Sequence, residues 1–442
     1  MNHILIFDIG KTNKKAFVFD ENYRVVWEDS TVLEEAADED GDACEDLPAL
    51  ISWMKSRYKE AKEQFNLKAV NFSSYGATLV FLDGNGRVLT PLYNYLKAYP
   101  EALKERFYAA YGGEEEFSKT AASPVLGSLN SGMLIYRLRH CRPEVFSYVK
   151  HILHLPNYLS YLFSGKKVTD VTSVGCHTNL WDFTREEYHH WVSEEGMERF
   201  LAPLHHAAVP FSDADSRVVG IGLHDSSAAL IPYLKRYDEP FALLSTGTWN
   251  ITMNPFNVGP LSLEELANDC LCYLKTDGKA TKASRLLGGM YHEQEAAKIA
   301  EHFHVTPEEL MKMSYDDEIK TEGLALENYR VVNPVSGLER DWQKYPTAAQ
   351  AYHQLMADLV ALQKRSSDLV LKSAPVNRLF VDGGFGKSRI FMKMLSAAYP
   401  NLEVFTSEVS QASALGAALV LHDSWNSRPV PEDLIKLKQF TD

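Results

Sequence analysis

Positive charge is in short supply in this sequence. It contains 45 Lys and Arg residues against 59 Asp and Glu residues, which gives a formal net charge of −14 at pH 7. A protein that binds nucleic acid needs clustered Lys and Arg side chains to neutralise the phosphates. The charge balance therefore argues against nucleic acid as the main partner. A small anionic ligand needs only a locally favourable pocket, so the balance leaves that class of ligand open.

Cysteines and long apolar runs are also scarce. Five cysteines are spread over 442 residues, a usage that is typical of a reducing compartment. Only Cys270 and Cys272 lie close together, and because no further ligands stand nearby at a metal-binding spacing, we interpret them as part of a buried strand. No apolar run approaches the roughly 18 residues of a membrane-spanning helix. We interpret the apolar start of the chain as a first strand, not as a secretory signal, and expect a cytoplasmic protein without membrane contact.

The length of the chain indicates two domains. Single cores rarely grow past a few hundred residues, so 442 residues exceed what one core usually serves. The hydrophobic share of 45% and the charged share of 24% are typical of globular domains with sizeable cores. No Pro-, Gly- or Ser-rich linker marks the boundary. We place it in the charged stretch between Pro232 and Pro240, which gives domains at 1–234 and 235–442.

One strand–polar loop–strand pattern occurs twice. The apolar segments that predict these strands are 4–7 and 16–19 in the first copy, and 241–244 and 249–253 in the second. Each copy opens a half that continues with further strands and with an amphipathic helix. Those helices are expected over 48–65 and 348–372. Two distant copies of one hairpin indicate a duplicated α/β domain. We also expect the strands at 69–72 and 79–82 to pair with each other, and helices to dominate residues 100–200.

The polar loop of the first copy, residues 8–15, has the composition of a phosphate-binding turn. A turn around Gly10 can aim backbone N–H groups at phosphate oxygens, and the Thr12 hydroxyl and the Asn13 amide add donors. Asp8, at the end of the strand, is placed to hold Mg²⁺ through water, because Mg²⁺ keeps part of its hydration shell. The alternative is a solvated turn with exposed lysines, since short glycine motifs recur by chance.

Two further glycine-containing loops follow in the second half. The loop at 245–248 repeats the first one, with an ordinary tight turn as the alternative. The segment 382–387 is a Gly-rich turn between a strand and a helix, where a ring or a phosphate can approach the backbone closely. The chain contains no G-x-x-x-x-G-K-[ST] motif, so it is not a P-loop protein.

Asp225 is the candidate catalytic base. It follows a Gly turn and opens a helix of small residues, a position from which a carboxylate can accept a proton from a substrate hydroxyl. The alternative is a helix cap, because Asp is a preferred capping residue.

Five motifs together resemble the FGGY carbohydrate kinases in order and spacing, over nearly the whole chain. They are Asp8-x-Gly10-x-Thr12-Asn13, Gly-x-His-Asp-Ser at 222–226, Ser-Thr-Gly-Thr-Trp at 245–249, Gly383-Gly384, and Ala-Leu-Gly-Ala-Ala at 414–418. The branch that the sequence resembles is that of the rhamnulokinases and fuculokinases. Its clues are Thr248-Trp249, His224 before Asp225, and the segments 155–165 and 169–173.

The resemblance implies two duplicated actin-like (ribonuclease H-like) domains with an ATP/sugar cleft between them, the first carrying the sugar site, the phosphate loop and the catalytic Asp, the second the nucleotide site. It implies ATP and Mg²⁺ as cofactors, with Asp225 as general base and Asp8 near the metal. The residues that it assigns to the nucleotide are Gly10, Lys11, Thr12, Asn13, Lys15, Gly247, Thr248, Gln294, Gly383 and Gly384. Those that it assigns to the sugar are Gly76, His224, Asp225 and Ser226.

The implied reaction is transfer of the γ-phosphate of ATP to a hydroxyl of a ketose, such as the 6-deoxyhexuloses L-rhamnulose or L-fuculose. The sequence departs from the family on the sugar side: no Trp or His precedes Gly76, no Arg-Asp follows Pro91, and Leu286 stands where an Asn is usual. Another ketose or polyol, such as xylulose, is therefore an alternative substrate. A non-catalytic actin-like nucleotide-binding protein is the alternative of another class. The oligomeric state stays open, a homodimer included.

Overall fold

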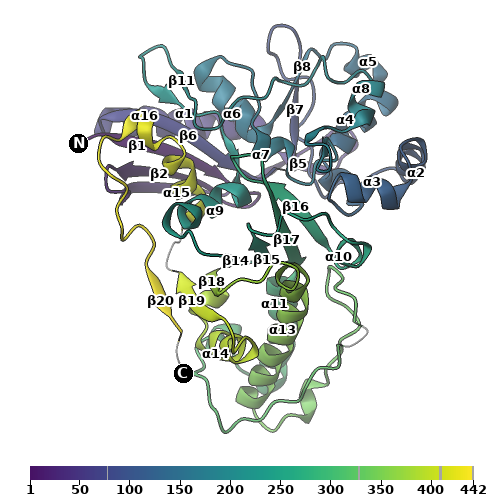
Figure 1. Cartoon of the computed structure of the whole chain (residues 1–442), viewed down its shortest axis with the longest axis vertical. Helices are drawn as coiled ribbons and strands as arrows, with labels where there is room; N and C mark the ends of the chain where they lie inside the picture. The colour runs from purple at the N-terminus through teal and green to yellow at the C-terminus, as the bar shows by residue number, and fades with distance from the viewer. Residues whose placement is uncertain (77, 327–328, 408–410, 441–442) are drawn as a thin grey trace. The chain divides into compact units, whose positions relative to one another are not determined.

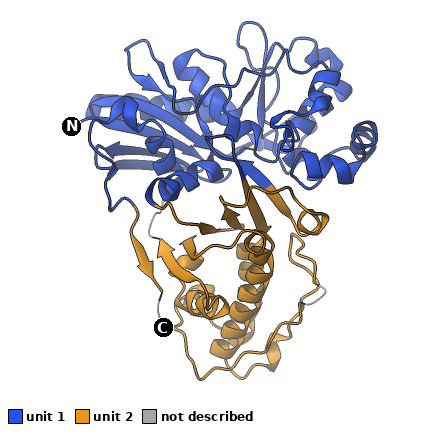
Figure 2. Ribbon diagram, in the orientation of Figure 1, with its two compact units in different colours: residues 1–236, 272–280, 411–434 blue, residues 237–271, 281–410, 435–442 orange. Residues whose placement is uncertain are grey.

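The chain forms two compact units. The computed structural model describes residues 1–76, 78–326, 329–407 and 411–440. Unit 1 comprises residues 1–236, 272–280 and 411–434, and unit 2 comprises 237–271, 281–410 and 435–442 (Figure 2). Each unit combines a central sheet with helices, which confirms the α/β class.

Unit 1 is built on a seven-stranded mixed sheet. Its strands are β1 (His3–Ile9), β2 (Lys14–Asp20), β3 (Val25–Thr31), β6 (Leu67–Ser74), β11 (Phe211–Ser212), β12 (Val218–Val219) and β13 (Leu223–His224). The order is β11-β12-β6-β1-β2-β3, with β13 also paired to β6. The first three strands form the predicted antiparallel meander, and β6 runs parallel to β1.

Helices cover both faces of this sheet (Figure 1). The helices of unit 1 are α1 (Leu47–Gln64), α2 (Glu101–Ala110), α3 (Glu114–Thr120), α4 (Gly132–Cys141), α5 (Pro143–Phe146), α6 (Leu155–Ser164), α7 (Val171–Val174), α8 (His190–Glu194), α9 (Asp225–Arg236), α15 (Ala412–Leu419) and α16 (His422–Trp425). Helix α1 lies where the sequence predicts it, and the Asp46 carboxylate caps it by accepting from Ala49 N at 2.8 Å. Alternate β1 side chains, Leu5, Phe7 and Ile9, share one core with α1 and α6.

The opposite face of β1 lies against α15. Asp8 falls on this face, and its carboxylate accepts a hydrogen bond from Ser413 of that helix. Helix α15 also packs on α9, and a Cβ atom placed on Gly416 would lie only 1.9 Å from the carbonyl oxygen of Ala228. The small residues of α15 therefore bring its backbone, and with it Ser413, close to the end of β1 and the start of α9.

The predicted pairing of the strands at 69–72 and 79–82 is wrong. Strand β6 uses both of its edges, with β1 on one side and β12 and β13 on the other. It therefore offers no free edge to β7 (Leu79–Leu82), which pairs with β8 (His151–His154) instead. Two further small sheets pair β4 (Glu35–Ala37) with β5 (Ala43–Glu45), and β9 (Trp181–Asp182) with β10 (Glu187–Tyr188).

The sheet of unit 2 repeats the connectivity of the first. Its strands are β14 (Phe241–Thr246), β15 (Asn250–Asn254), β16 (Cys270–Leu274), β17 (Ala280–Leu286), β18 (Arg378–Gly383), β19 (Glu403–Ser407) and β20 (Leu437–Gln439), in the order β16-β17-β15-β14-β18-β19-β20. Strand β14 pairs antiparallel with β15 and parallel with β18, as β1 does with β2 and β6. This shared pattern confirms the predicted duplication. Both Cys270 and Cys272 are buried on β16, as expected.

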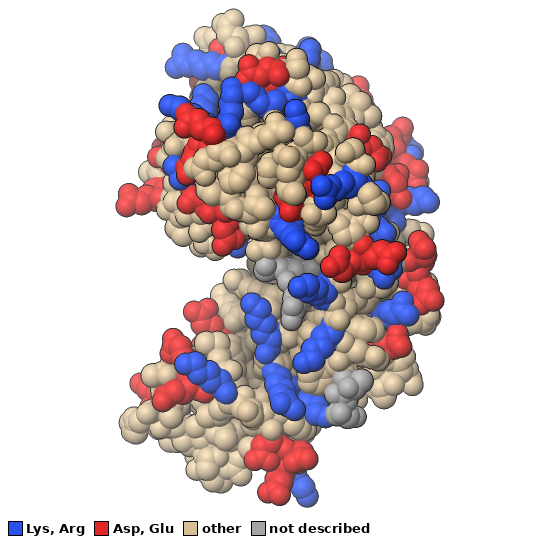
Figure 3. Space-filling view, turned by 90° about the vertical axis from the view of Figure 1, so that its left-hand side faces the viewer, with Lys and Arg blue, Asp and Glu red and all other residues tan. Residues whose placement is uncertain are grey.

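Unit 2 contains α13 (Ala348–Leu371), the longest helix among the described residues. Its other helices are α10 (Leu263–Ala267), α11 (Gly288–Phe303), α12 (Pro307–Met311) and α14 (Arg389–Ala398). Helix α13 follows the prediction for 348–372 closely and packs between α11, α14 and β15 (Figure 1). Among the described residues, no helix combines the length and the apolar character needed to cross a membrane. Acidic and basic side chains occur side by side on the face drawn in Figure 3.

Candidate active site

The turn between β1 and β2 is held from beneath by a buried lysine. Gly10 N donates to Asn13 O at 3.0 Å and closes the turn. Lys14, only 1% exposed, donates from Nζ to Gly10 O at 3.2 Å and to Lys11 O at 2.7 Å, and pairs with Glu45 at 2.6 Å. A solvated turn is not expected to have a buried ammonium group that binds two of its carbonyl oxygens. The geometry therefore favours a turn with a fixed backbone conformation.

The predicted ligand side chains of this turn point in different directions. Thr12 and Asn13 are exposed. Lys11 forms an ion pair with Glu35, so its charge is directed along the surface of unit 1. Lys15 stands opposite Asp8 in the β1–β2 ladder, which puts their side chains on the same face of the sheet.

Asp8 and Asp225 lie close enough to influence each other. The Asp8 carboxylate accepts from Ser413 Oγ at 2.9 Å. Burial first, and then the negative charge of Asp225, raise the pKa of Asp8 to about 6 against the opposing effects of Ser413 and Lys15. The structure thus brings together three residues that the sequence assigns to the metal, the phosphates and the base.

Asp225 opens α9 with a carboxylate that is partly accessible. Its side chain is 34% exposed, and Oδ1 accepts from the backbone N of Ser226 at 2.6 Å and from the Ser226 hydroxyl at 3.2 Å. Desolvation raises the pKa of Asp225, which makes it a stronger base than a carboxylate in water. An accessible carboxylate with increased basicity suits proton abstraction better than capping alone.

His224 lies beside this carboxylate. Its Nε2 lies 3.3 Å from Asp225 Oδ1, and its Nδ1 lies 3.2 Å from Ser227 Oγ. Ser227 Oγ also donates to the carbonyl oxygen of Leu274 at 2.9 Å. Burial lowers the pKa of His224 to about 3, which keeps the imidazole neutral at physiological pH.

Three residues around His224 were missed from the sequence. Cys176 donates from Sγ to Gly76 O at 3.4 Å and so links the predicted sugar residue Gly76 to this cluster. The Tyr273 ring lies 4.9 Å from the His224 ring and 6.0 Å from the His177 ring, measured between centroids. The adjacent Cys176-His177 pair was the only local signal, because its neighbours in space come from distant segments.

In unit 2, the two predicted glycine-containing loops converge with the start of α11. Gly384 N donates to Thr246 O at 3.1 Å, and Phe385 N donates to Thr246 Oγ1 at 3.0 Å. Gly289, in the first turn of α11, donates from N to Thr248 O at 3.2 Å. Backbone contacts thus join the loop at 245–248, the turn at 382–387 and the start of α11 into one surface of unit 2.

Gly383 is the tightest point of this surface. It has φ of +83°, and a Cβ atom there would lie 1.8 Å from Thr246 O. Gln294 lies exposed on α11, past the turn that touches Thr248. Sequence reasoning missed Arg285, whose guanidinium lies 5.1 Å from the Trp249 ring centroid while it pairs with Asp269.

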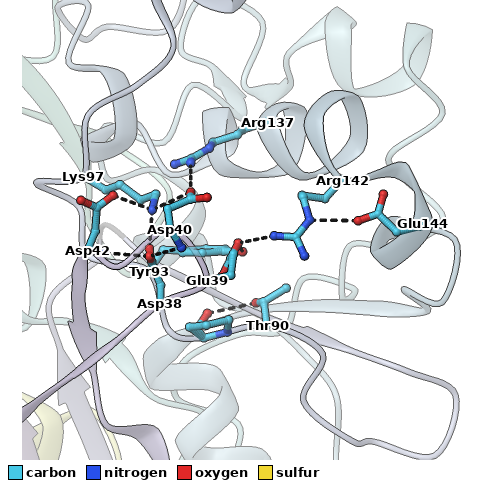
Figure 4. Close-up of polar contacts among 11 residues, drawn as sticks. Asp38, Glu39, Asp40, Asp42, Thr90, Tyr93, Lys97, Arg137, Arg142 and Glu144 are labelled. Atoms are coloured by element: carbon cyan, nitrogen blue, oxygen red, sulfur yellow. Dashed lines mark hydrogen bonds and ion pairs between the residues drawn. The ribbon is translucent and has the colours of Figure 1, made fainter.

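A second polar cluster in unit 1 lies around Lys97 (Figure 4). The ammonium group of Lys97 pairs with Asp38, Asp40 and Asp42 and occupies the place that a cation would take among them. Beside it lies a cavity of about 220 Å³, whose lining includes Tyr93, Cys141 and further residues of α4. Because the amine already neutralises the carboxylates, we interpret this cluster as the anchor of the loop at 38–42.

Comparison with known proteins identifies related sequences. A model of the N-terminal domain of the FGGY family of carbohydrate kinases matches residues 3–197, and a model of the FGGY carbohydrate kinase C-terminal domain matches 238–429. The rhamnulokinase of Halalkalibacterium halodurans is 24% identical over 264 residues, which cover 57% of this chain and 56% of that relative. The rhamnulokinase of Mannheimia succiniciproducens is 22% identical over 467 residues, covering 99% of this chain and 94% of that relative.

Solved structures share the fold at low sequence identity. A carbohydrate kinase from Novosphingobium aromaticivorans superposes with a TM-score of 0.77 at 20% identity, over 99% of this chain and 93% of that one. A ligand-bound xylulose kinase from Lactobacillus acidophilus gives 0.80 at 14% identity, over 96% and 89%. The glycerol kinase of Plasmodium falciparum with ADP gives 0.72 at 17% identity, over 97% and 91%. The actin-like fold expected from the sequence is thereby confirmed.

Proposed function

Because the chain belongs to the FGGY family of carbohydrate kinases, we propose that it transfers the γ-phosphate of ATP to a hydroxyl of a ketose. The observation that carries this proposal is the pair of carboxylates in unit 1. Asp225 is partly exposed and made more basic by desolvation, and Asp8 lies near it beside the β1–β2 turn. A proton acceptor next to a site for metal and phosphates is what transfer to an alcohol requires.

In the proposed mechanism, Asp225 accepts the proton of the attacking hydroxyl. The new bond joins that hydroxyl oxygen to the γ-phosphorus, and the bond to the β–γ bridging oxygen breaks, so that ADP leaves with the electron pair. The desolvated carboxylate favours the proton transfer. His224, held neutral beside Asp225, would contact the acceptor next to the base.

The Asp8 carboxylate fits Mg²⁺, because oxygen donors are the ligands that this ion prefers. Bound there, Mg²⁺ would neutralise charge on the phosphates. The exposed Thr12 and Asn13 and the closed turn at Gly10 would bind phosphate oxygens, with Lys15 adding positive charge.

Unit 2 supplies the proposed nucleotide residues. Gly247 and Thr248 would approach the phosphates from the second hairpin turn, and Gly383 and Gly384 would lie against the adenosine. An alanine at Gly384 would meet no protein atom within 4 Å, so the backbone there is open to a ligand. Gln294 lies exposed on the helix whose first turn touches Thr248. We place the reaction in the cytoplasm, where ATP is made.

The proposed acceptor is a 6-deoxyhexulose such as L-rhamnulose or L-fuculose. Both relatives described above carry the name rhamnulokinase, one of them aligned over almost its whole length. The Tyr273 and His177 rings beside His224 give unit 1 a partly apolar surface near the base, which suits a methyl group at the end of a sugar. Xylulose is the second candidate, because Leu286 and the residues around Gly76 depart from the family on the sugar side.

The test is ADP release from Mg-ATP with L-rhamnulose, L-fuculose, D-xylulose and glycerol, each compared at several concentrations. We expect the highest kcat/KM with a 6-deoxyhexulose, and a sugar-stimulated release that is about 10²–10⁴-fold slower in Asp225→Asn. If no sugar or polyol stimulates ADP release while ATP still binds, the non-catalytic alternative is correct. A clear preference for D-xylulose would retain the kinase and reject the proposed acceptor.

A further inference from the structure

The Glu45 carboxylate connects the β1–β2 turn to the segment around Gly76. One of its oxygens, Oε1, lies 2.6 Å from the ammonium group of Lys14, the lysine that binds two carbonyl oxygens of the turn. Its other oxygen, Oε2, accepts a hydrogen bond from the Tyr75 hydroxyl at 3.2 Å. The side chains of Lys14 and Glu45 are both buried. Neither charge can therefore be removed without leaving the other uncompensated inside unit 1.

The two hydrogen bonds from Lys14 set the direction of the peptide groups in the turn. In a planar trans peptide, the C=O of one residue and the N–H of the next residue point in opposite directions. Lys14 holds the carbonyl oxygens of Gly10 and Lys11 on its own side. The N–H groups of Lys11 and Thr12 therefore point away from Lys14. Successive N–H groups on one side of a turn form a concave site for an anion such as a phosphate.

The two adjacent lysines of β2 lie on opposite faces of the strand. Lys15 stands across from Asp8 in the β1–β2 ladder, whereas Lys14 stands across from Ile9. Lys15 can therefore add positive charge on the face that carries Asp8. Lys14, which is buried on the other face, can act only through the backbone of the turn that it holds.

The small β4–β5 sheet supplies the negative charges that face the turn. Glu35 and Glu45 stand opposite each other in its ladder, and a pair of like charges in that arrangement is destabilising by itself. Lys11 forms an ion pair with Glu35, and Lys14 forms one with Glu45. The two lysines of the turn thus neutralise the two carboxylates, which fixes the turn and the β4–β5 sheet to each other.

Tyr75 connects this network to the residues beside the proposed base. Its backbone N donates to the carbonyl oxygen of Ile9, the last residue of β1, at 3.3 Å. Burial, and then the negative charge of Glu45, raise the pKa of Tyr75 well above its ordinary value, so the hydroxyl stays protonated and can donate. Gly76 follows directly, and a Cβ atom placed on it would lie 2.8 Å from Cδ2 of His224. A displacement of Tyr75 would therefore reach the His224 ring.

We propose that Lys14 and Glu45 are positioning residues for phosphoryl transfer, with Tyr75 as their link to the acceptor side. The inference rests on the proposed function and deepens it. Lys14 orients the N–H groups of the turn before ATP binds, so that no reorganisation is needed when the phosphates arrive. Glu45 holds Lys14 and Tyr75 at the same time, so one buried carboxylate fixes the phosphate side and the sugar side of unit 1.

The phosphate side is tested by calorimetric binding of Mg-ATP to the full-length protein in the absence of sugar. Lys14→Met is expected to weaken binding about 10–100-fold, the loss that corresponds to one hydrogen bond to a charged group. Lys282→Met is the matched control, because the buried Lys282 ammonium group also lies 2.6 Å from a buried carboxylate, that of Glu265 in unit 2. The control is expected to lose stability as well, but to bind Mg-ATP as the wild type does.

Steady-state kinetics separate the two sides. Tyr75→Phe removes one hydroxyl and is expected to raise the KM for the sugar about 3–10-fold, in line with the loss of one hydrogen bond, while Mg-ATP binding stays unchanged. Glu45→Gln keeps the volume of the side chain and removes its charge, and it is expected to weaken Mg-ATP binding and to raise the KM for the sugar together. A purely structural network would lower the Tm of these variants without this division between the two substrates.

A folded Lys14→Met variant that binds Mg-ATP as tightly as the wild type overturns the proposal, and so does an equal weakening in Lys282→Met. Thermal unfolding shows whether each variant is folded, and Glu45→Gln takes the place of Lys14→Met under the same criterion if the latter does not fold. An unchanged KM for the sugar in Tyr75→Phe rejects the link to the acceptor side. A wild type that binds Mg-ATP but phosphorylates no sugar rejects the proposed function, whereas the binding result for Lys14→Met still decides the role of the turn.

Discussion

Gly383→Ala is expected to destabilise unit 2 by about 2–5 kcal/mol. The residue has φ of +83°, where an L-residue costs roughly 1–2 kcal/mol more than glycine. The new Cβ atom would also lie 1.8 Å from Thr246 O, and relieving such overpacking costs about 1–3 kcal/mol. That oxygen belongs to the neighbouring strand β14 and also accepts from Gly384 N, so it cannot move aside without disturbing the ladder.

Gly384→Ala is the matched control. Gly384 has helical φ and ψ of −63° and −48°, and its Cβ atom would meet no protein atom within 4 Å. The free energy of unfolding of Gly384→Ala is expected to stay within about 0.5 kcal/mol of that of the wild type. Because Gly384 is proposed to lie against the adenosine, the same variant should raise the KM for ATP while leaving the fold unchanged.

Urea unfolding and thermal unfolding of both variants measure the difference. A loss of about 2–5 kcal/mol corresponds to a fall in Tm of roughly 5–15 °C for a unit of this size. A Gly383→Ala variant as stable as the wild type would refute the argument from backbone strain. A Gly384→Ala variant with an unchanged KM for ATP would contradict the nucleotide role of this turn.

Three further predictions concern unit 1. Asp225→Asn is expected to lower kcat by about 10²–10⁴-fold with little change in ATP affinity measured by calorimetry, and near-normal turnover would reject the base. The raised pKa of Asp8, about 6 against an ordinary 3.8, means that the folded state binds more protons between these pH values, so stability falls as pH rises through this window. Urea unfolding at several pH values should show that stability falls less steeply with rising pH in Asp8→Asn than in the wild type. An identical pH profile in the two proteins would contradict this role of Asp8. Lys97→Met should cost about 2 kcal/mol, below the range for fully buried pairs because Asp40 and Asp42 are 49% and 55% exposed. In urea unfolding, the double variant with Lys97→Met and Asp38→Asn should lose less stability than Lys97→Met alone, which would confirm the ion pair. An equal or larger loss in the double variant would contradict the pairing.

The sequence predicted what depends on local pattern. Hairpins around residues 8–15 and 245–248 and the long helix at 348–372 are confirmed, because apolar periodicity and turn residues determine them. The partner of β7 could not be found in this way, since it depends on β6 having both edges occupied by strands from elsewhere in the chain.

The same distinction between local and long-range features applies to the candidate site. Asp8, Gly10 and Asp225 stand in recognisable local motifs, so their neighbourhood could be expected from the sequence. The burial of Lys14 could not, because it depends on Glu45 lying beneath the turn. The contact of His224 with Cys176, His177 and Tyr273 joins three segments that no local pattern connects.

The return of residues 411–434 to unit 1 has a consequence for biosynthesis. Helix α15 covers the face of β1 that carries Asp8, and it packs on α9 as well. While the ribosome is still making unit 2, that face of β1 lacks the helix that covers it in the complete chain. Unit 1 can complete its core only after about nineteen-twentieths of the chain has been synthesised. A premature stop just before α15 therefore removes few residues but leaves the first half of the protein unfinished, exposing apolar surface to chaperones and proteases.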